Sequence, residues 1–230
     1  LDRKFNLFNN QLIGNQDSNV SIGKESLFLL NKNCDGGLWN IAIGPDTQHS
    51  LCNAEQNTAI GRAAQYVLTK GAGNIAIGAT SQRNLKEGSY NIGLGTDTMY
   101  NSEIAFNNIA IGYDALHDNI EGNDNVSIGY LSGYVSPNSE INSRYVNRNV
   151  WIGNFTGKSV MENINDSIAI GYRAKNDKSN QVVLGNENIK ETNLYGVVSV
   201  ERLVFRDFGN LDLLNELDII KEKIKNLEKR

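Results

Sequence analysis

Small and bulky hydrophobic residues alternate in a five-residue pattern that recurs along most of the chain. In the clearest copy, Asn74-Ile75-Ala76-Ile77-Gly78, two isoleucines flank one alanine between an asparagine and a glycine. Because successive side chains of a strand point to opposite faces, each copy predicts a short strand with bulky residues on one face and small residues on the other. The copies end at Gly14, Gly23, Gly44, Gly61, Gly78, Gly95, Gly112, Gly129, Gly153, Gly171 and Gly185.

The spacing of these copies predicts how the strands are arranged. From Gly44 to Gly129 the interval is 17 residues each time, and outside that block it varies. A unit this short cannot bury a hydrophobic face by itself, so the fixed period predicts stacked coils. The predicted fold class is all-β: a parallel β-solenoid or β-roll of 17-residue coils. At about 4.8 Å per coil, the stack should be on the order of 48 Å long.

Two residue types of the repeat have predicted structural roles. The glycine at its end permits the positive φ of a tight corner. Parallel stacking places each asparagine above the next one, which predicts a ladder of hydrogen bonds between asparagine side chains. After each glycine we expect a second strand-like segment and then a variable polar loop back to the next asparagine.

Three further columns emerge when the copies are aligned on their glycine. Three positions past the glycine every residue is small, so this position meets either the neighbouring coil or another chain. Seven positions past it, Leu30, Leu51, Leu68 and Leu85 predict a buried column. Five positions past it the residues are aromatic or basic, which indicates either a binding stripe or a column that joins neighbouring coils. The candidate stripe comprises His49, Tyr66, Arg83, Tyr100 and His117.

The period breaks between residues 130 and 151. Residues 130–148 form a longer segment with three tyrosines and a proline, and a tryptophan then occupies a small-residue position of the repeat. Loops that interrupt a rigid scaffold commonly carry function. The alternative is an insertion that packs against the solenoid. We predict receptor contacts in this region, at Tyr134, Arg144, Tyr145, Arg148 and Trp151.

The ends of the chain differ from the repeat. We expect residues 1–13 to form a cap or lead-in, residues 14–193 the β-roll and residues 194–209 a junction. Residues 210–230 carry a heptad pattern, in which leucine at a and isoleucine at d favour three or four strands over two. The alternative is a single amphipathic helix that folds back. The predicted trimerisation residues are Leu213, Leu217, Ile220, Ile224 and Leu227.

The repeats also resemble those of a known family. Asn-Ile-Ala-Ile-Gly strands are similar to the head repeats of YadA-like trimeric autotransporter adhesins, and residues 111–130 (IGYDALHDNIEGNDNVSIGY) look closer still to repeats of viral and phage tail-fibre proteins. The resemblance covers residues 10–185 and the heptad segment. It implies a left-handed β-roll of three chains followed by a neck and a coiled coil. The 17-residue period is longer than that of adhesin heads.

Composition and charge narrow the choice of function. The chain has 230 residues and a net charge of −4, with no basic field that would favour nucleic acid. No apolar run approaches the roughly 18 residues of a membrane-spanning helix, so membrane insertion is not expected. Neither a membrane-anchor barrel nor a chaperone domain follows the heptads, and we expect the chain to be a fragment or processed product. Cys34 and Cys52, in nearly the same phase of successive repeats, either form a disulfide or remain free thiols.

Candidate catalytic chemistry is sparse. His49 and His117 are the only histidines, and four coils at about 4.8 Å separate them by on the order of 19 Å. They cannot share a metal ion within one chain. Gly71-Ala72-Gly73 and Gly93-Leu94-Gly95 do not precede predicted helices, so neither resembles a phosphate-binding loop. We expect no enzymatic activity, no metal site and no cofactor.

The sequence therefore predicts a trimeric, non-enzymatic fibre module that attaches a virus or phage particle to a host cell. Its expected partners are two further copies of itself, a host surface glycan or protein, and other fibre or virion proteins. Its expected location is extracellular, on a virion appendage. The alternatives are the head of a bacterial trimeric adhesin on the cell surface, or a purely structural spacer.

Overall fold

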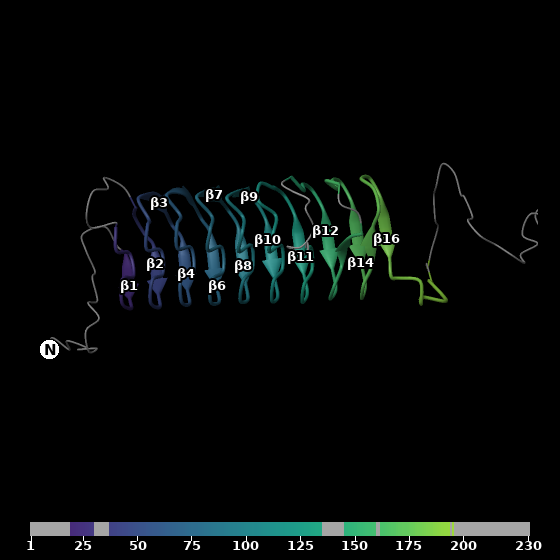
Figure 1. Ribbon diagram of the computed structural model, residues 1–230, viewed down its shortest axis with the longest axis horizontal. Coiled ribbons are helices and arrows are strands. Elements are labelled where there is room, and N and C mark those ends of the chain that lie inside the picture. Colours follow the sequence, from purple (N-terminus) through teal and green to yellow (C-terminus); the bar gives the residue numbers. More distant parts are fainter. Residues whose placement is uncertain (1–18, 30–36, 135–144, 160–161, 194, 196–230) are drawn as a thin grey trace, which may run out of the picture. The chain divides into compact units, whose positions relative to one another are not determined.

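The computed structural model describes residues 19–29, 37–134, 145–159, 162–193 and 195 (Figure 1). The chain divides into two compact units, Leu1–Lys190 and Glu191–Arg230, and the first contains the repeats. The predicted cap (1–13), most of the junction and the whole heptad segment (210–230) lie outside the described residues, so those predictions stay open.

The repeats form a parallel β-solenoid, as predicted, and Figure 1 shows its coils side by side. A ten-stranded parallel sheet contains one strand from each described copy of the repeat: β1 (Val20–Ile22), β2 (Ile41–Ile43), β4 (Thr58–Ile60), β6 (Ile75–Ile77), β8 (Ile92–Leu94), β10 (Ile109–Ile111), β11 (Val126–Ile128), β12 (Val150–Ile152), β14 (Ile168–Ile170) and β16 (Val182–Leu184). A four-stranded sheet contains β3 (Asn53–Glu55), β5 (Lys70–Ala72), β7 (Glu87–Ser89) and β9 (Ile104–Phe106). A pair contains β13 (Gly157–Lys158) and β15 (Lys175–Asn176).

The ten-stranded sheet keeps one register through every irregular interval of the sequence. Val126 pairs with Val150 across the longest segment between regular copies, just as Ile109 pairs with Val126 one regular coil earlier. At the C-terminal end, Ile168 pairs with Val182 although only 14 residues separate them. Variation in coil length is therefore absorbed by the connecting loops and never by the strands.

The small residues of the repeat face the interior, and the bulky ones face outward. Ala76 of β6 is fully buried, whereas Ile77 beside it is 40% exposed. The same alternation holds along the sheet, with Ala42, Ala59, Ala110 and Ala169 fully buried. The opposite wall of each coil lies close, so the interior accepts only a methyl group or a hydroxyl at most of these positions.

A ladder of buried asparagines runs through the interior, which confirms the predicted stacking. The Nδ2 of Asn74 donates to Oδ1 of Asn57 at 2.9 Å, and the Nδ2 of Asn91 donates to Oδ1 of Asn74 at 2.9 Å. Each Nδ2 also donates across the coil to a backbone carbonyl, as Asn74 does to Gly88 at 2.7 Å. Each Oδ1 additionally accepts the backbone N–H of the next asparagine in the ladder. The amides are therefore buried with their hydrogen bonds made.

In the regular coils the segment after the glycine differs from its prediction. It is a stacked turn rather than a strand, because the second and fourth residues past the glycine adopt positive φ, 56° at Thr80 and 51° at Gln82. This allows the adjacent Ser81 and Gln82 both to be buried, which a strand would not. The second strand of the coil lies instead in the stretch expected to be a polar loop, as β5 and β7 do. After Gly153 and Gly171 the predicted strand is present, as β13 and β15.

The glycine itself is required by close packing between coils. Gly78 has φ of 137°, and a Cβ there would lie 2.3 Å from the carbonyl oxygen of Gly95 in the next coil. The small residue three positions further on also contacts its neighbour, since Oγ of Ser81 lies 2.7 Å from Oγ1 of Thr98. The sequence left two contacts open for this column, the neighbouring coil or another chain, and the structure shows the contact with the neighbouring coil.

The predicted leucine column is confirmed where the structure describes it, and it ends in an unsatisfied amide. Leu51, Leu68 and Leu85 are fully buried, while Leu30 lies outside the described residues. Two coils past Leu85 the same position is Asn119, which is 2% exposed and whose side-chain amide has no hydrogen-bond partner among the described residues. Cys52 beside this column is disulfide-bonded, and the chain's other cysteine lies outside the described residues.

Replacement of Asn119 by leucine should stabilise the protein. A buried amide without partners costs about 1–3 kcal/mol, and leucine restores the residue type of the three earlier coils. We expect the free energy of unfolding to rise by about 1 kcal/mol or more in a denaturant titration. Asn108→Leu makes the same chemical change within the satisfied ladder and should be strongly destabilising. Equal effects at the two positions would contradict this account.

Candidate functional site

The predicted stripe of aromatic and basic residues is one continuous ladder. Its rings lie nearly parallel, with centroids 4.8 Å apart between His49 and Tyr66 and 5.2 Å apart between Tyr100 and His117. Between them the guanidinium of Arg83 lies 5.3 Å from the ring of Tyr66 and 5.7 Å from that of Tyr100. The full column is Phe28, His49, Tyr66, Arg83, Tyr100, His117 and Tyr134.

This ladder joins neighbouring coils, which is the structural alternative to a binding stripe. Because the planes of His49 and Tyr66 differ by only 15°, each ring covers a face of the other. Such pairs contribute about 0.5–1.5 kcal/mol beyond the area they bury. What remains for a partner is ring edges and polar atoms, so binding by this stripe stays a prediction.

Acidic side chains surround His117 within the ladder. Its Nδ1 lies 2.8 Å from Oδ1 of Asp118, and its Nε2 lies 3.8 Å from Oδ1 of Asp114. Burial acts to lower the pKa of His117, but the hydrogen bond and charge of Asp118, with the charges of Asp114 and Asp97, outweigh it and raise the pKa. Burial raises the pKa of Asp114. The charge of His117 lowers that pKa, and the charges of Asp97 and Asp118 raise it, so the net shift is upward. Both groups therefore bind protons more readily in the folded chain.

The stability of the solenoid should accordingly fall as the pH rises through neutrality. Because the pKa of His117 is raised above 6.5 in the folded chain, its protonation stabilises the fold. This stability is fully present below pH 6.5 and is lost as the pH rises through the pKa of the folded chain. We expect a higher melting temperature at about pH 6 than at about pH 8.5. His117→Gln should remove most of this difference. A variant that keeps the full pH dependence would show that other groups cause it.

The tryptophan at the break of the period is buried, which corrects the expectation that Trp151 contacts a receptor. Its side chain is 1% exposed, and its Nε1 donates to Oδ1 of Asn176 at 3.1 Å. Gly133 makes room for the ring, since a Cβ there would lie 2.7 Å from Cε3 of Trp151. A large residue thus fills a small-residue position because a glycine on the facing wall compensates. An outside partner cannot reach the indole.

The other predicted receptor residues have different surroundings. Arg148 forms a bidentate ion pair with Asp166, at 2.6 and 2.9 Å, on the surface. Tyr134 packs edge-on against His117 at the end of the ladder, with centroids 5.6 Å apart. Tyr145 is 46% exposed, and Arg144 lies outside the described residues. Among those described, Tyr145 and Arg148 are exposed, and the guanidinium of Arg148 is already paired with Asp166.

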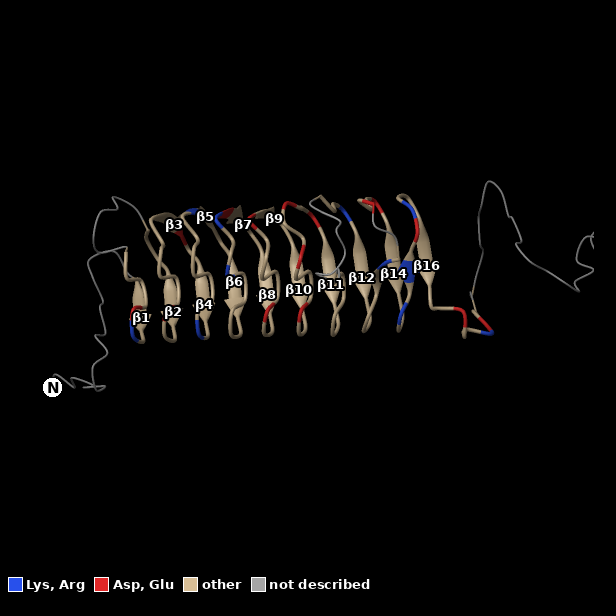
Figure 2. Ribbon diagram, in the orientation of Figure 1, with Lys and Arg blue, Asp and Glu red and all other residues tan. Residues whose placement is uncertain are grey.

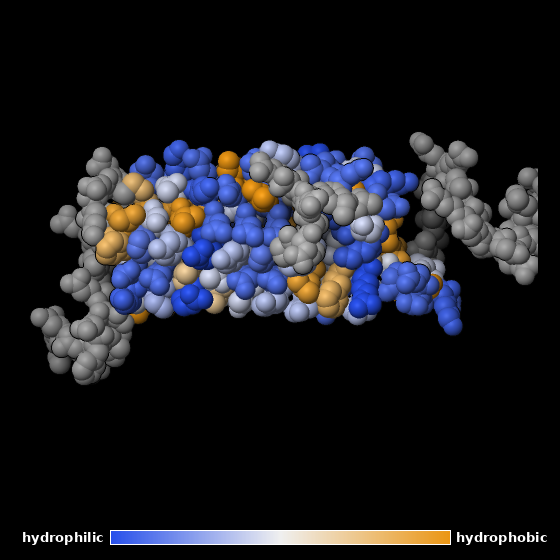
Figure 3. Space-filling model, viewed as in Figure 1, coloured by the Kyte–Doolittle hydropathy of each residue, from blue (hydrophilic) through white to orange (hydrophobic). Residues whose placement is uncertain are grey.

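The outer face of the ten-stranded sheet is a continuous aliphatic surface that was not predicted. These ten strands carry no charged residue, and Figure 2 shows the charges on other parts of the coils. Nineteen of the twenty outward positions on these strands are valine, isoleucine or leucine, the exception being Thr58. We call these residues the aliphatic face. By contrast, the side of the solenoid seen in Figure 3 is largely hydrophilic, with separate hydrophobic patches.

The alternation in the repeat was the signal for this surface, but the sequence did not tell which side of each strand faces inward. The usual expectation is that bulky aliphatic residues form the core. On these strands it is the alanines that face the interior, where they lie with the asparagine ladder and the leucine column. Monomeric soluble proteins rarely expose large contiguous apolar surfaces, so the aliphatic face is typical of an interaction surface.

The described residues contain neither a cluster of metal-ligand side chains nor a candidate membrane-spanning helix. In those ranges, no group of three or more His, Cys, Asp or Glu residues is arranged to hold a metal ion. No helix in that part of the chain is long and apolar enough to cross a bilayer.

Comparison with known proteins gave one structural similarity. No family model matches the chain, and no curated protein matches it. The crystal structure of the collagen-binding domain of the Yersinia adhesin YadA is similar to it at 19% sequence identity and a TM-score of 0.46. The match covers 87% of this chain and 98% of that domain. Similarity at this level assigns the chain neither a family nor a ligand.

Proposed function

We propose that this protein is a non-enzymatic, trimeric module of an extracellular fibre that attaches a virus or phage particle to a host cell. The observation that carries the proposal is the aliphatic face. It runs along all ten strands, it is uncharged, and half-exposed to exposed side chains line it throughout. A surface of this kind marks an interaction site, and a partner that repeats with the same period would cover its whole length.

Further copies of the same chain are the partner that fits best. A second solenoid presents the same strand spacing, so the two aliphatic faces match coil for coil. In the heptad segment 210–230, Leu217 at a and Ile220 at d support three or four chains, and the resemblance of the repeats supports three. The trimer proposed here thus has the aliphatic faces at its centre and the turns and loops at its periphery.

Host recognition then belongs to the parts of each coil that remain outside. The charged residues lie outside the ten strands, and so do exposed aromatic side chains such as Trp39 and Tyr145. The head of a bacterial trimeric adhesin would use the same geometry. The two candidates share attachment as the function and differ in what carries the fibre.

Charges placed on the aliphatic face should dissociate the trimer. Ile77 and Ile111 occupy the outer face two coils apart, and Ile77→Glu with Ile111→Glu would bury six carboxylates at the centre of the assembly. Burying an unpaired charge costs several kcal/mol, so we expect the mass in solution to fall from three times 25.4 kDa to 25.4 kDa. Light scattering after gel filtration measures this.

The control carries the same charges on another face. Tyr90 and Ile104 are 66% and 42% exposed, and neither belongs to the ten-stranded sheet. Tyr90→Glu with Ile104→Glu should leave the trimer intact. Circular dichroism checks that both variants keep the fold. A monomeric wild-type chain, or dissociation of both variants alike, would sink the proposed assembly.

Attachment should depend on assembly. Three chains joined in one fibre bind a cell surface with an avidity that can exceed single-site affinity by about a hundredfold. We therefore expect the labelled wild-type trimer to bind host cells in flow cytometry and the Ile77→Glu, Ile111→Glu variant to lose most of that binding. A trimer that binds no cell across a panel of bacterial and animal hosts would favour the structural spacer.

A further inference from the structure

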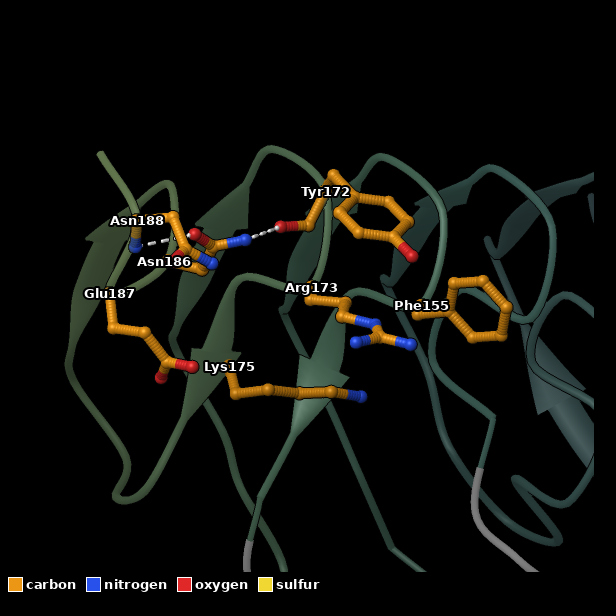
Figure 4. A pocket seen from close by; sticks show the side chains of 7 residues that line it. All are labelled: Phe155, Tyr172, Arg173, Lys175, Asn186, Glu187 and Asn188. Carbon is orange, nitrogen blue, oxygen red and sulfur yellow. Dashed lines mark hydrogen bonds between the residues drawn. The ribbon is translucent and has the colours of Figure 1, made fainter. Parts of the chain in front are cut away.

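A pocket opens at the C-terminal coils of the solenoid, away from the aromatic ladder. Its volume is about 420 Å³, within the range of about 300–1,000 Å³ that is common for small-molecule sites. Phe155, Tyr172, Arg173 and Lys175 line one side, and residues 186–188 line the other (Figure 4). None of these residues was singled out by the sequence.

Two cations share this pocket without a carboxylate partner. The guanidinium carbon of Arg173 lies 5.2 Å from the ring centroid of Tyr172 and 5.7 Å from that of Phe155. Lys175 is half-buried beside it, and burial together with the charge of Arg173 lowers the pKa of Lys175. Within the described part of the chain, neither cation forms an ion pair. Like charges held together in this way favour an anion between them.

The remaining lining supplies aromatic surface and hydrogen-bonding groups. Asn186 donates through Nδ2 to the carbonyl of Tyr172 at 2.7 Å and accepts the backbone N–H of Asn188 at 2.9 Å, and these two bonds hold the loop against the coil (Figure 4). Tyr172 is 54% exposed. Glu187 is the single carboxylate of the lining, and its charge opposes that of an anionic ligand.

We propose that this pocket binds a carboxylated sugar ring. This rests on the proposed attachment function and names a ligand class for it. Arg173 and Lys175 pair with the carboxylate, because charge-assisted hydrogen bonds are the strongest that a partly exposed site offers. Phe155 and Tyr172 provide apolar surface for the C–H face of a pyranose. The amide of Asn188 and the hydroxyl of Tyr172 are within the lining to meet ring hydroxyls.

The combination favours a sugar over an acidic peptide. A carboxylate alone would need only the two cations, and an acidic side chain would leave the aromatic rings and amides of the pocket unused. A neutral sugar would leave both cations without a counter-charge. The lining therefore selects for a ligand that carries a carboxylate and a ring with several hydroxyls.

The test uses the full chain and a matched pair of probes. Methyl β-glucuronide and methyl β-glucoside have the same ring and differ only in the carboxylate. We expect the glucuronide to bind at least about tenfold more tightly in ligand-observed NMR titrations, since one charge-assisted hydrogen bond is worth about that factor. Acetate and N-acetylaspartate are titrated beside them to separate the sugar from its charge.

Variants connect the binding to this pocket. Arg173→Gln and Lys175→Met remove the cations with little change of shape, and each should weaken glucuronide binding about tenfold. Glu187→Gln removes the opposing charge and should strengthen it. Lys178→Gln removes the same charge from an exposed position of the same coil outside the lining and should change nothing.

Two results would overturn the inference. Equal binding of glucuronide, acetate and N-acetylaspartate would mean that the pocket recognises only charge or an acidic peptide. Glucuronide binding that survives both cation variants would place the ligand elsewhere. If the pocket inference fails but the trimer still binds cells, the proposed attachment function is unaffected. If the chain binds glucuronide but neither forms a trimer nor binds cells, the attachment function is wrong and the pocket inference holds.

Discussion

The asparagine ladder is the interaction on which the rest of the solenoid depends. Each buried amide donates through Nδ2 to Oδ1 of the asparagine in the previous coil and to a backbone carbonyl on the opposite wall, as Asn91 does with Asn74 and Ala105. An unpaired buried amide is costly, so the coils can stack only in the register that satisfies the ladder. Strands therefore stay aligned across segments of 14 to 24 residues, and length variation moves into the loops.

The same ladder decides what lies inside and outside. Because the amides span the coil, the two walls are close and the strands present small side chains inward, such as Ala42 and Ala110. The bulky aliphatic residues must then face outward, and they form a surface that suits a second and third solenoid. The bulky aliphatic residues of the ten strands thus form a proposed interface, while the leucine column fills the core. Recognition is left to the turns, the loops and the ends of the stack.

Most of the fold was predictable because a short repeat of fixed length implies stacked coils. The repeat predicted the parallel coils, the asparagine ladder, the glycine corners and the buried Leu51–Leu68–Leu85 column. Three features were not predictable from spacing. The turn after each glycine depends on positive φ at ordinary residues such as Gln82. Burial of Trp151 depends on Gly133 across the coil. The pocket at Arg173 joins residues from coils without a regular interval between them.

Regular coils, on this account, are an interchangeable scaffold, and recognition lies outside them. Deletion of residues 75–91 removes one whole coil and joins Asn74 to Ile92, so that the repeat reads on without a gap. We predict a folded protein with a cooperative thermal transition and with the cell binding of the parent chain. A deletion variant that fails to fold, or that folds and no longer binds cells, would contradict the role given to the coils.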